Sequence, residues 1–203
     1  MSALRKLFFN TRMTWLRVVI FAVAAAVVTA VMLILPFTED TSLENIGVSF
    51  ECWIIFALVI IMNSSSPLEA GLKTFVFFLI SQPLIYLLQV PFTWMGWSIF
   101  RYYPTWGMLT VACFPGGMIA YFVKKDNVLS ALILSVATGI LAGETVYFVL
   151  TVINSFPRNL LSAVFCAVWA VLLIFVLLRK RQTRLICAIA TAAVSVVFSG
   201  VNL

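Results

Sequence analysis

Long apolar blocks alternate with short polar connections along the whole chain. The blocks run for roughly 15 to 26 residues, close to the ~20 residues that an α-helix needs to cross ~30 Å of hydrocarbon. Seven segments are long and apolar enough for this: Leu16–Leu35, Leu43–Met62, Leu72–Phe92, Thr105–Val123, Val128–Ile153, Asn159–Leu178 and Leu185–Leu203. We therefore predict an all-α, polytopic transmembrane helical bundle that forms a single integral membrane domain over residues 1–203.

The last segment is the weakest of the seven, because Thr191, Ser195 and Ser199 dilute its apolar character. Such a segment either crosses the bilayer or lies flat at its surface. The prediction is therefore seven helices, with six helices as the alternative.

The composition agrees with this architecture. The chain is 64% hydrophobic and only 10% charged, whereas soluble globular domains are about 25% charged. A soluble protein is therefore excluded, and the lipid bilayer is the first expected partner.

The basic residues follow the expected topology of a membrane protein, in which positive charge gathers on the cytoplasmic side. We predict that the N-terminus lies inside and the C-terminus outside, which puts eleven of the thirteen basic residues inside: Arg5, Lys6, Arg12, Arg17, Lys73, Lys124, Lys125, Arg179, Lys180, Arg181 and Arg184. Only Arg101 and Arg158 fall outside, together with the acidic loop that contains Glu39, Asp40 and Glu44. The net charge of +6 is thus explained by topology, and no nucleic-acid partner is expected.

Cysteine and histidine usage argues against metal and disulfide chemistry. The four cysteines, Cys52, Cys113, Cys166 and Cys187, all lie in apolar segments without CxxC spacing, and the chain has no histidine. Cysteines in such segments are typical small buried hydrophobes. We expect no metal, no cofactor and no catalytic residue.

Two carboxylates stand inside apolar segments. Glu144 lies about 16 residues from the inner end of its segment, roughly 24 Å along a helix that rises 1.5 Å per residue. Glu51 lies either at the interface or about 12 Å deep, depending on whether its helix begins at Gly47 or Leu43. A carboxylate within a span costs at least ~2.5 kcal/mol to insert, so an intramembrane carboxylate is a candidate functional residue.

The sequence also predicts which way Glu144 faces. Ser135, Gly139 and Gly143 recur at four-residue spacing, the small-xxx-small pattern that lets two membrane helices approach closely. Tyr147 follows Glu144 by three residues and lies on the same face. We therefore expect Glu144 to point into the bundle.

Further polar groups that could line a pocket occur on the third segment. Gln82, Tyr86 and Gln89 have i, i+4, i+7 spacing and share one face. Pro83 in the same segment predicts a kink at mid-span. Before this segment, Ser66 and Pro67 are typical of a helix start.

The connection from Phe92 to Trp106 is rich in aromatic residues and has a single basic one, Arg101. It has two interpretations, an aromatic belt at the membrane interface or a lid that offers a guanidinium to an anionic group. The candidate substrate-binding residues are Glu144, Glu51, Gln82, Tyr86, Gln89, Tyr147 and Arg101.

The first segment carries an alanine strip, with Ala22, Ala26 and Ala30 at four-residue spacing. With the chain length, the basic start and the outward polar groups, this strip resembles the substrate-binding S-components of energy-coupling-factor vitamin transporters. The resemblance implies a small solute bound near the outer face and a partner membrane subunit that docks on the strip. The segment from Ser66 to Tyr86 also resembles small bacterial membrane proteins without an assigned activity, and we expect a multi-pass protein of the bacterial plasma membrane.

Three functions remain open. The first is a solute-binding or transport protein whose outward-facing pocket holds Glu51 and Glu144 and takes a small solute, cationic or hydrogen-bonding. The second is a non-catalytic partner or regulatory subunit that docks through its alanine and glycine strips. The third is an intramembrane enzyme, which the lack of histidine and of a nucleophile–base pair disfavours.

Overall fold

The computed structural model describes residues 2–35, 41–43, 50–154, 156–157 and 159–202. All regular structure in these ranges is helical, which confirms the all-α prediction. The helices are α1 (Ser2–Phe9), α2 (Trp15–Ile34), α4 (Phe50–Met62), α5 (Pro67–Gln89), η1 (Gly96–Tyr102), α6 (Tyr103–Ala120), η2 (Tyr121–Lys125), α7 (Val128–Asn154), α8 (Leu160–Leu177) and α9 (Arg181–Asn202). Six spans are long and apolar enough to cross a membrane, so the chain is a multi-pass membrane protein.

Each of the seven predicted segments contains a helix, but the short one is the second rather than the last. Within the described residues α4 has 13 residues, fewer than a full span needs. In contrast, α9 has 22 residues and runs along α7. The choice between six and seven spanning helices therefore depends on α4.

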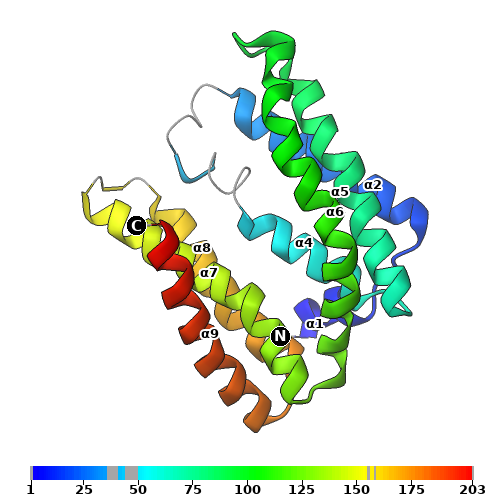
Figure 1. The fold of residues 1–203 in the computed structure, drawn as a ribbon, viewed down its shortest axis with the longest axis vertical. Helices are drawn as coiled ribbons and strands as arrows, with labels where there is room; N and C mark the ends of the chain where they lie inside the picture. The colour runs from blue at the N-terminus through cyan, green and yellow to red at the C-terminus, as the bar shows by residue number, and fades with distance from the viewer. Residues whose placement is uncertain (1, 36–40, 44–49, 155, 158, 203) are drawn as a thin grey trace.

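The spans form two groups of three with α4 between them (Figure 1). Helices α2, α5 and α6 pack together and make the amino-terminal lobe. Helices α7, α8 and α9 make the carboxy-terminal lobe, in which α7 is the central element. The two lobes diverge toward the end where α5 meets α6 and where α7 meets α8 (Figure 1).

Aromatic rings fasten α4 to the amino-terminal lobe. The Phe56 ring lies 5.1 Å from that of Phe21 on α2, and the Trp53 ring lies 5.9 Å from that of Phe78 on α5. Phe77 is fully buried and contacts both Trp53 and Phe21. Such edge-to-face and tilted ring pairs stabilise a core beyond the area they bury.

The alanine strip on α2 is covered by the chain itself. Ala22, Ala26 and Ala30 are buried, because α2 packs along α5 with this side turned inward. Small side chains let the two backbones approach, as the spacing predicts. The expectation that a partner subunit docks on this strip is therefore wrong for this conformation, since the strip has no free surface.

The glycine strip on α7 is also used within the chain. A Cβ atom added at Gly143 would lie 2.7 Å from Cδ1 of Phe198 on α9, and one added at Gly139 would lie 2.5 Å from Cβ of Val194. The predicted close helix approach is confirmed, and the approaching helix is α9. A docking role for this strip toward another protein is wrong, because α9 covers it.

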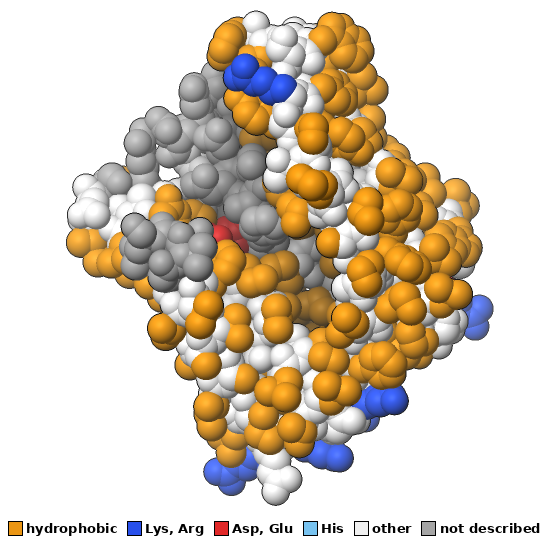
Figure 2. All heavy atoms as spheres, in the orientation of Figure 1, with side chains coloured by type: hydrophobic (Ala, Val, Ile, Leu, Met, Phe, Trp, Pro, Cys, Tyr) orange, Lys and Arg blue, Asp and Glu red, His pale blue; other side chains and the backbone are white. Residues whose placement is uncertain are grey.

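Basic residues gather at one end of the bundle, which we call the basic end. The helix ends that meet there carry Arg12, Arg17, Lys73, Lys124, Lys125, Arg179, Lys180, Arg181 and Arg184. Figure 2 shows basic side chains along the lower and right margins and one basic group at the top. Arg101 belongs to η1, at the opposite end, while Arg158 and the acidic loop residues Glu39, Asp40 and Glu44 lie outside the described residues.

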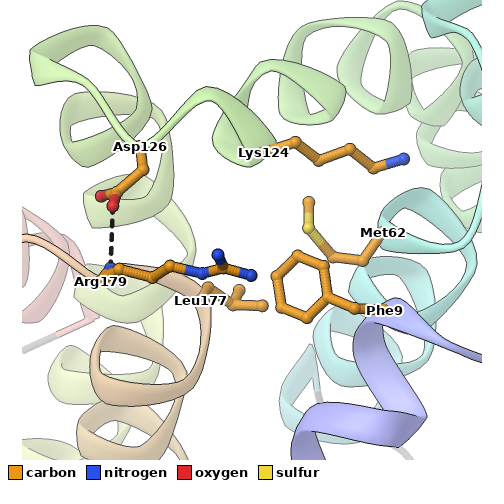
Figure 3. Close-up of a pocket in the computed structure, with 6 residues that line it drawn as sticks. All are labelled: Phe9, Met62, Lys124, Asp126, Leu177 and Arg179. Carbon is orange, nitrogen blue, oxygen red and sulfur yellow. Dashed lines mark hydrogen bonds between the residues drawn. The ribbon is translucent and has the colours of Figure 1, made fainter.

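Asp126 joins two helices of the carboxy-terminal lobe at the basic end. Its carboxylate accepts a hydrogen bond from the backbone N–H group of Arg179 at 3.0 Å (Figure 3). It also accepts from the backbone N–H group of Lys180 at 3.1 Å and from Thr183 Oγ1 at 2.7 Å. These donors lie at the start of α9, where a carboxylate is favourable to the helix dipole. Asp126 itself adopts a left-handed conformation with φ of 47°.

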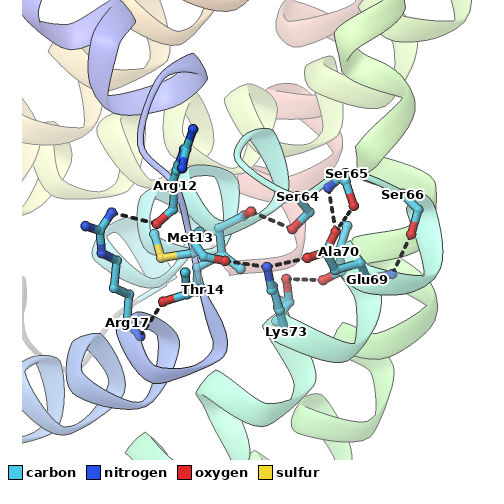
Figure 4. A network of polar contacts seen from close by, with 12 residues as sticks. Arg12, Met13, Thr14, Arg17, Ser64, Ser65, Ser66, Glu69, Ala70 and Lys73 are labelled. Atoms are coloured by element: carbon cyan, nitrogen blue, oxygen red, sulfur yellow. Dashed lines mark hydrogen bonds and ion pairs between the residues drawn. The ribbon is translucent and has the colours of Figure 1, made fainter.

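Lys73 joins the amino-terminal helices at the same end (Figure 4). Its ammonium group is buried and donates to the Met13 carbonyl and to the Glu69 carboxylate. Ser66 Oγ accepts from Glu69 N at 3.2 Å, and Pro67 follows at the first helical position, which confirms the predicted helix start. These contacts fix where α2 and α5 begin relative to each other.

The helix α1 was not predicted from the sequence. Its Phe8 is fully buried, and the side chain of Asn63 at the end of α4 ties it down. Asn63 Nδ2 donates to the Leu7 carbonyl at 2.7 Å, and Asn63 Oδ1 accepts from Thr11 N at 2.9 Å. The segment before the first span is therefore part of the packed basic end.

Candidate functional site

Two carboxyl groups lie within electrostatic range of each other where α4 lies against the carboxy-terminal lobe. Glu51 is in the first turn of α4, and Glu144 is in the second half of α7. The Glu51 side chain is fully buried, whereas Glu144 is half-buried, and the two are close enough for their charges to interact. The structure thus brings together the two carboxylates that the sequence placed within apolar segments.

A cysteine from a third helix completes this acidic cluster. The Cys166 thiol on α8 donates a hydrogen bond to Glu51 Oε1 at 3.5 Å. The same thiol lies within electrostatic range of Glu144 and of Cys52, the residue after Glu51. Three helices, α4, α7 and α8, therefore contribute to one cluster, which we call the acidic cluster and define as Glu51, Cys52, Glu144 and Cys166.

A cavity of about 740 Å³ lies between the two lobes and is bordered by α4. We call it the interlobe groove; its walls come from α4, α5, α6 and α7 and include Trp53, Ile54, Phe78, Cys113, Gly116 and Ile140. Nearly all of its lining is apolar. Figure 2 shows a hollow between the lobes that is lined by hydrophobic side chains.

Helix periodicity places the two carboxylates beyond one end of the interlobe groove. Glu144 follows the lining residue Ile140 by one turn of α7, and residues four apart share a helix face. Glu51 precedes the lining residue Ile54 by three positions on α4, near the edge of the lining face. One helical turn is ~5.4 Å, so both carboxylates belong to the turn next to the groove.

The third helix of the groove carries an amide at the corresponding position. Gln82 follows the lining residue Phe78 by one turn of α5. Gln82 and the neighbouring Ser81 are buried, and among the described residues neither Gln82 Nε2 nor Ser81 Oγ has a hydrogen-bond partner. Buried polar groups in proteins are nearly always hydrogen-bonded, so these two atoms are available to a bound molecule.

The other predicted residues of α5 make contacts elsewhere. The Tyr86 ring packs against Phe100 at 5.8 Å and against Tyr103 at 6.1 Å, in an aromatic group at the end where η1 lies. Gln89 Nε2 donates to the Ile85 carbonyl of its own helix at 3.2 Å. Of the three polar residues predicted on this face, only Gln82 has a side-chain nitrogen without a partner in the described part of the chain.

Arg101 and Tyr147 are at the surface. The Arg101 guanidinium donates to the hydroxyl of Tyr102 at 2.8 Å and lies over the same ring, at 4.9 Å. Trp94, in the same connection, is 92% exposed, as an aromatic belt requires. Tyr147 is exposed on α7, and its ring lies 5.5 Å from that of Phe148.

A second hollow of about 480 Å³ lies at the basic end (Figure 3). Lys124 and Arg179 line it together with the apolar Phe9, Met62 and Leu177. Lys124 donates to a backbone carbonyl at the end of α4, and the Asp126 carboxylate is held by the start of α9. The polar groups of this hollow thus mainly hold helix ends together.

Sequence reasoning did not identify Cys166 as part of the site. The sequence does contain a signal for it, because the polar residue Ser162 precedes Cys166 by one turn of α8 and so lies on the same helix face. Ser162 is buried as well and donates to the Ser42 carbonyl at 3.3 Å. Two polar residues on one face of an otherwise apolar helix mark the side that faces other polar groups.

The acidic cluster suits a positively charged or hydrogen-donating molecule. Two neighbouring carboxylates repel each other, so a shared proton or a bound cation stabilises the pair. Among the described residues no group of three or more histidine, cysteine or acidic side chains has a geometry for a metal ion.

Comparisons with models of known protein families, with curated proteins and with solved structures find no match to this chain.

Proposed function

We propose that this chain is a membrane protein that binds and transports a small cationic solute through a site centred on Glu51 and Glu144. The observation that carries the proposal is the meeting of these two carboxylates on different helices, one fully buried and the other half-buried. Burial of two like charges is costly, and a cationic ligand offsets this cost. Gln82 adds a buried hydrogen-bonding group one turn beyond the interlobe groove.

The orientation belongs to the same proposal. With the basic end in the cytoplasm, the diverging ends of the two lobes face outward (Figure 1). A solute would then enter the acidic cluster from outside the cell. The S-component resemblance is compatible with such a pocket, but a partner subunit would have to use a surface other than the buried alanine strip.

The test is ligand-induced stabilisation of the purified full chain in detergent. Methylammonium and guanidinium ions serve as probes, and we expect each to raise the melting temperature of the parent protein. Glu144→Gln and Glu51→Gln should remove this rise, whereas Glu144→Asp, which keeps the charge, should retain it. Asp126→Asn is the matched control, because it removes a carboxylate at the basic end, away from the site.

Uptake into liposomes that contain the reconstituted protein separates transport from binding. The proposal requires accumulation of radiolabelled methylammonium that depends on Glu144. If the glutamine variants fold, respond to the cations and accumulate them as the parent does, the proposal is wrong. A folded protein that responds to no cation would favour the non-catalytic partner or regulatory subunit instead.

A further inference from the structure

We infer that the ligand of this site is an amphiphile, with a cationic head at Glu51 and Glu144 and an apolar body in the interlobe groove. The inference rests on the proposed function and names the class of its ligand. It combines two features that lie side by side, the acidic cluster and the apolar cavity of about 740 Å³.

The first argument is that three of the helices lining the groove carry a polar residue about one turn from a lining residue. On α7 the lining face runs through Ala137 and Ile140 to Glu144, and on α5 it runs through Thr74 and Phe78 to Gln82. On α4, Glu51 stands one turn before the lining residue Ile54. A molecule lying along the groove would therefore meet apolar side chains for most of its length and polar atoms at one end.

The second argument concerns access to the groove. Lining residues of α6 and α7 keep much of their surface exposed, with Ile119 56% exposed and Val136 53% exposed. The groove therefore opens sideways between these two helices. Because both are long apolar spans, this opening faces the hydrocarbon of the bilayer, from which an amphiphile can enter.

The third argument is the free space at Gly116. A Cβ atom added there would meet nothing within 4 Å, although Gly116 lies in the middle of α6 and lines the groove. The next residue, Gly117, differs, because an added Cβ would lie 3.0 Å from the Gly71 Cα. Gly117 thus serves helix packing, whereas Gly116 leaves room that a ligand can fill.

The charge of the site selects the head group. An ammonium or guanidinium head is attracted to the carboxylates, while a phosphate would be repelled by them. The buried Gln82 amide can pair with a polar atom next to the charged centre. The ligand class is therefore an alkyl or aryl ammonium or guanidinium ion rather than an ordinary phospholipid.

The test measures binding of n-alkylammonium ions, from methylammonium to octylammonium, to the full chain in phosphatidylcholine nanodiscs, with protein-free discs subtracted. We expect the affinity, relative to the free aqueous ion, to rise about 3- to 4-fold per added methylene. Octanol serves as the uncharged probe of the same length and should bind more weakly. Glu144→Gln should abolish binding of both short and long ions.

Two leucine substitutions on α6 make a matched pair. Gly116→Leu fills the groove and should weaken octylammonium binding at least 10-fold while leaving methylammonium binding unchanged. Gly107→Leu adds the same side chain to the same helix outside the groove, where an added Cβ makes an ordinary 3.8 Å contact with Tyr103. This control substitution should leave the binding of both ions unchanged.

The outcomes separate the inference from the proposed function. Methylammonium binding without a chain-length dependence, or octylammonium binding that is indifferent to Gly116→Leu, overturns the inference and leaves the proposed function standing. Octanol binding as strong as that of octylammonium also overturns it, because the groove would then hold neutral apolar molecules. If neither ion binds and Glu144→Gln changes nothing, the proposed function itself fails.

Discussion

The Cys166 thiol donates a hydrogen bond to Glu51 Oε1 across 3.5 Å, although the two residues are 115 positions apart in the chain. This contact links α8 to α4 at the acidic cluster. Because both partners are fully buried, the bond is shielded from water, and its loss should reduce the stability of the folded state.

Replacement of Cys166 by alanine should therefore lower the free energy of unfolding by about 1 kcal/mol, the typical net contribution of one hydrogen bond. Cys166→Ser keeps a donor and should cost less. Cys187→Ala is the control for loss of a buried thiol, because Cys187 on α9 is fully buried. Its Sγ atom lies 4.0 Å from Thr191 Oγ1, a long distance for a hydrogen bond. Thermal melting in detergent measures all three variants. Equal melting temperatures for the alanine and serine variants would show that the hydrogen bond does not matter.

Gly139→Ala should destabilise the seam between α7 and α9. The added Cβ would lie 2.5 Å from Cβ of Val194, so the helices must separate, which typically costs about 1–3 kcal/mol. Gly116→Ala is the control, because its Cβ enters open space and alanine favours a helix over glycine by up to about 1 kcal/mol. Hydrogen exchange of α9 amides should rise in the first variant and stay unchanged in the second. If Gly116→Ala were the less stable variant and showed the faster exchange of α9 amides, the packing described for this seam would be wrong.

Lys73→Met should destabilise the basic end by about 1–3 kcal/mol, because it removes the buried donor to the Met13 carbonyl and to the Glu69 carboxylate, which keeps its hydrogen bonds from Ser65. If the ion pair is the main cause, the double variant Lys73→Met with Glu69→Gln should lose less stability than the sum of the stability losses in the two single variants. Melting temperatures of the three variants form the complete cycle. Strict additivity would mean that the two residues act independently.

Asp126→Asn should reduce stability at neutral pH but not in acid. Burial raises the pKa of the Asp126 carboxyl, but the hydrogen bonds from Thr183, Arg179 and Lys180 and the charge of Lys180 outweigh this and lower it. A lowered pKa in the folded state contributes stability above the ordinary value of 3.8, and this stability is lost as the pH falls through the folded pKa.

Asparagine tolerates the left-handed backbone at position 126, so the variant tests the charge rather than the turn. We expect a loss of about 1 kcal/mol at pH 7, as for a lost helix cap. The difference in melting temperature from the parent should narrow below pH 3.8. A difference that stays constant from pH 7 to pH 3 would show that the carboxylate charge contributes nothing.

The sidedness of the chain can be tested with single cysteines in a variant that lacks the native ones. Trp94→Cys at the aromatic end should react with a membrane-impermeant maleimide in intact cells, because Trp94 is 92% exposed. Lys125→Cys at the basic end should react only after the cells are opened. The reverse pattern would place the basic end outside and contradict the positive-inside assignment.

The sequence alone was sufficient for the helical architecture, because it depends on local physics. A run of ~20 apolar residues in lipid must satisfy its own backbone hydrogen bonds, and a helix does this within the segment. The start of α5 at Ser66 and Pro67 and the close approach at Gly139 could be predicted for the same reason, since capping and small-residue spacing act over a few neighbouring positions. The cost of a carboxylate in hydrocarbon likewise made Glu144 and Glu51 visible as candidates.

Which helices meet was decided only by the tertiary structure. The alanine strip of α2 and the glycine strip of α7 have the same pattern whether they face another protein or their own chain, and here both face their own chain. For the same reason Cys166 could not be assigned to Glu51 from spacing, and the interlobe groove could not be foreseen. Periodicity determines which face of a helix is polar or small, but the choice of the helix that covers it depends on contacts between residues far apart in the chain.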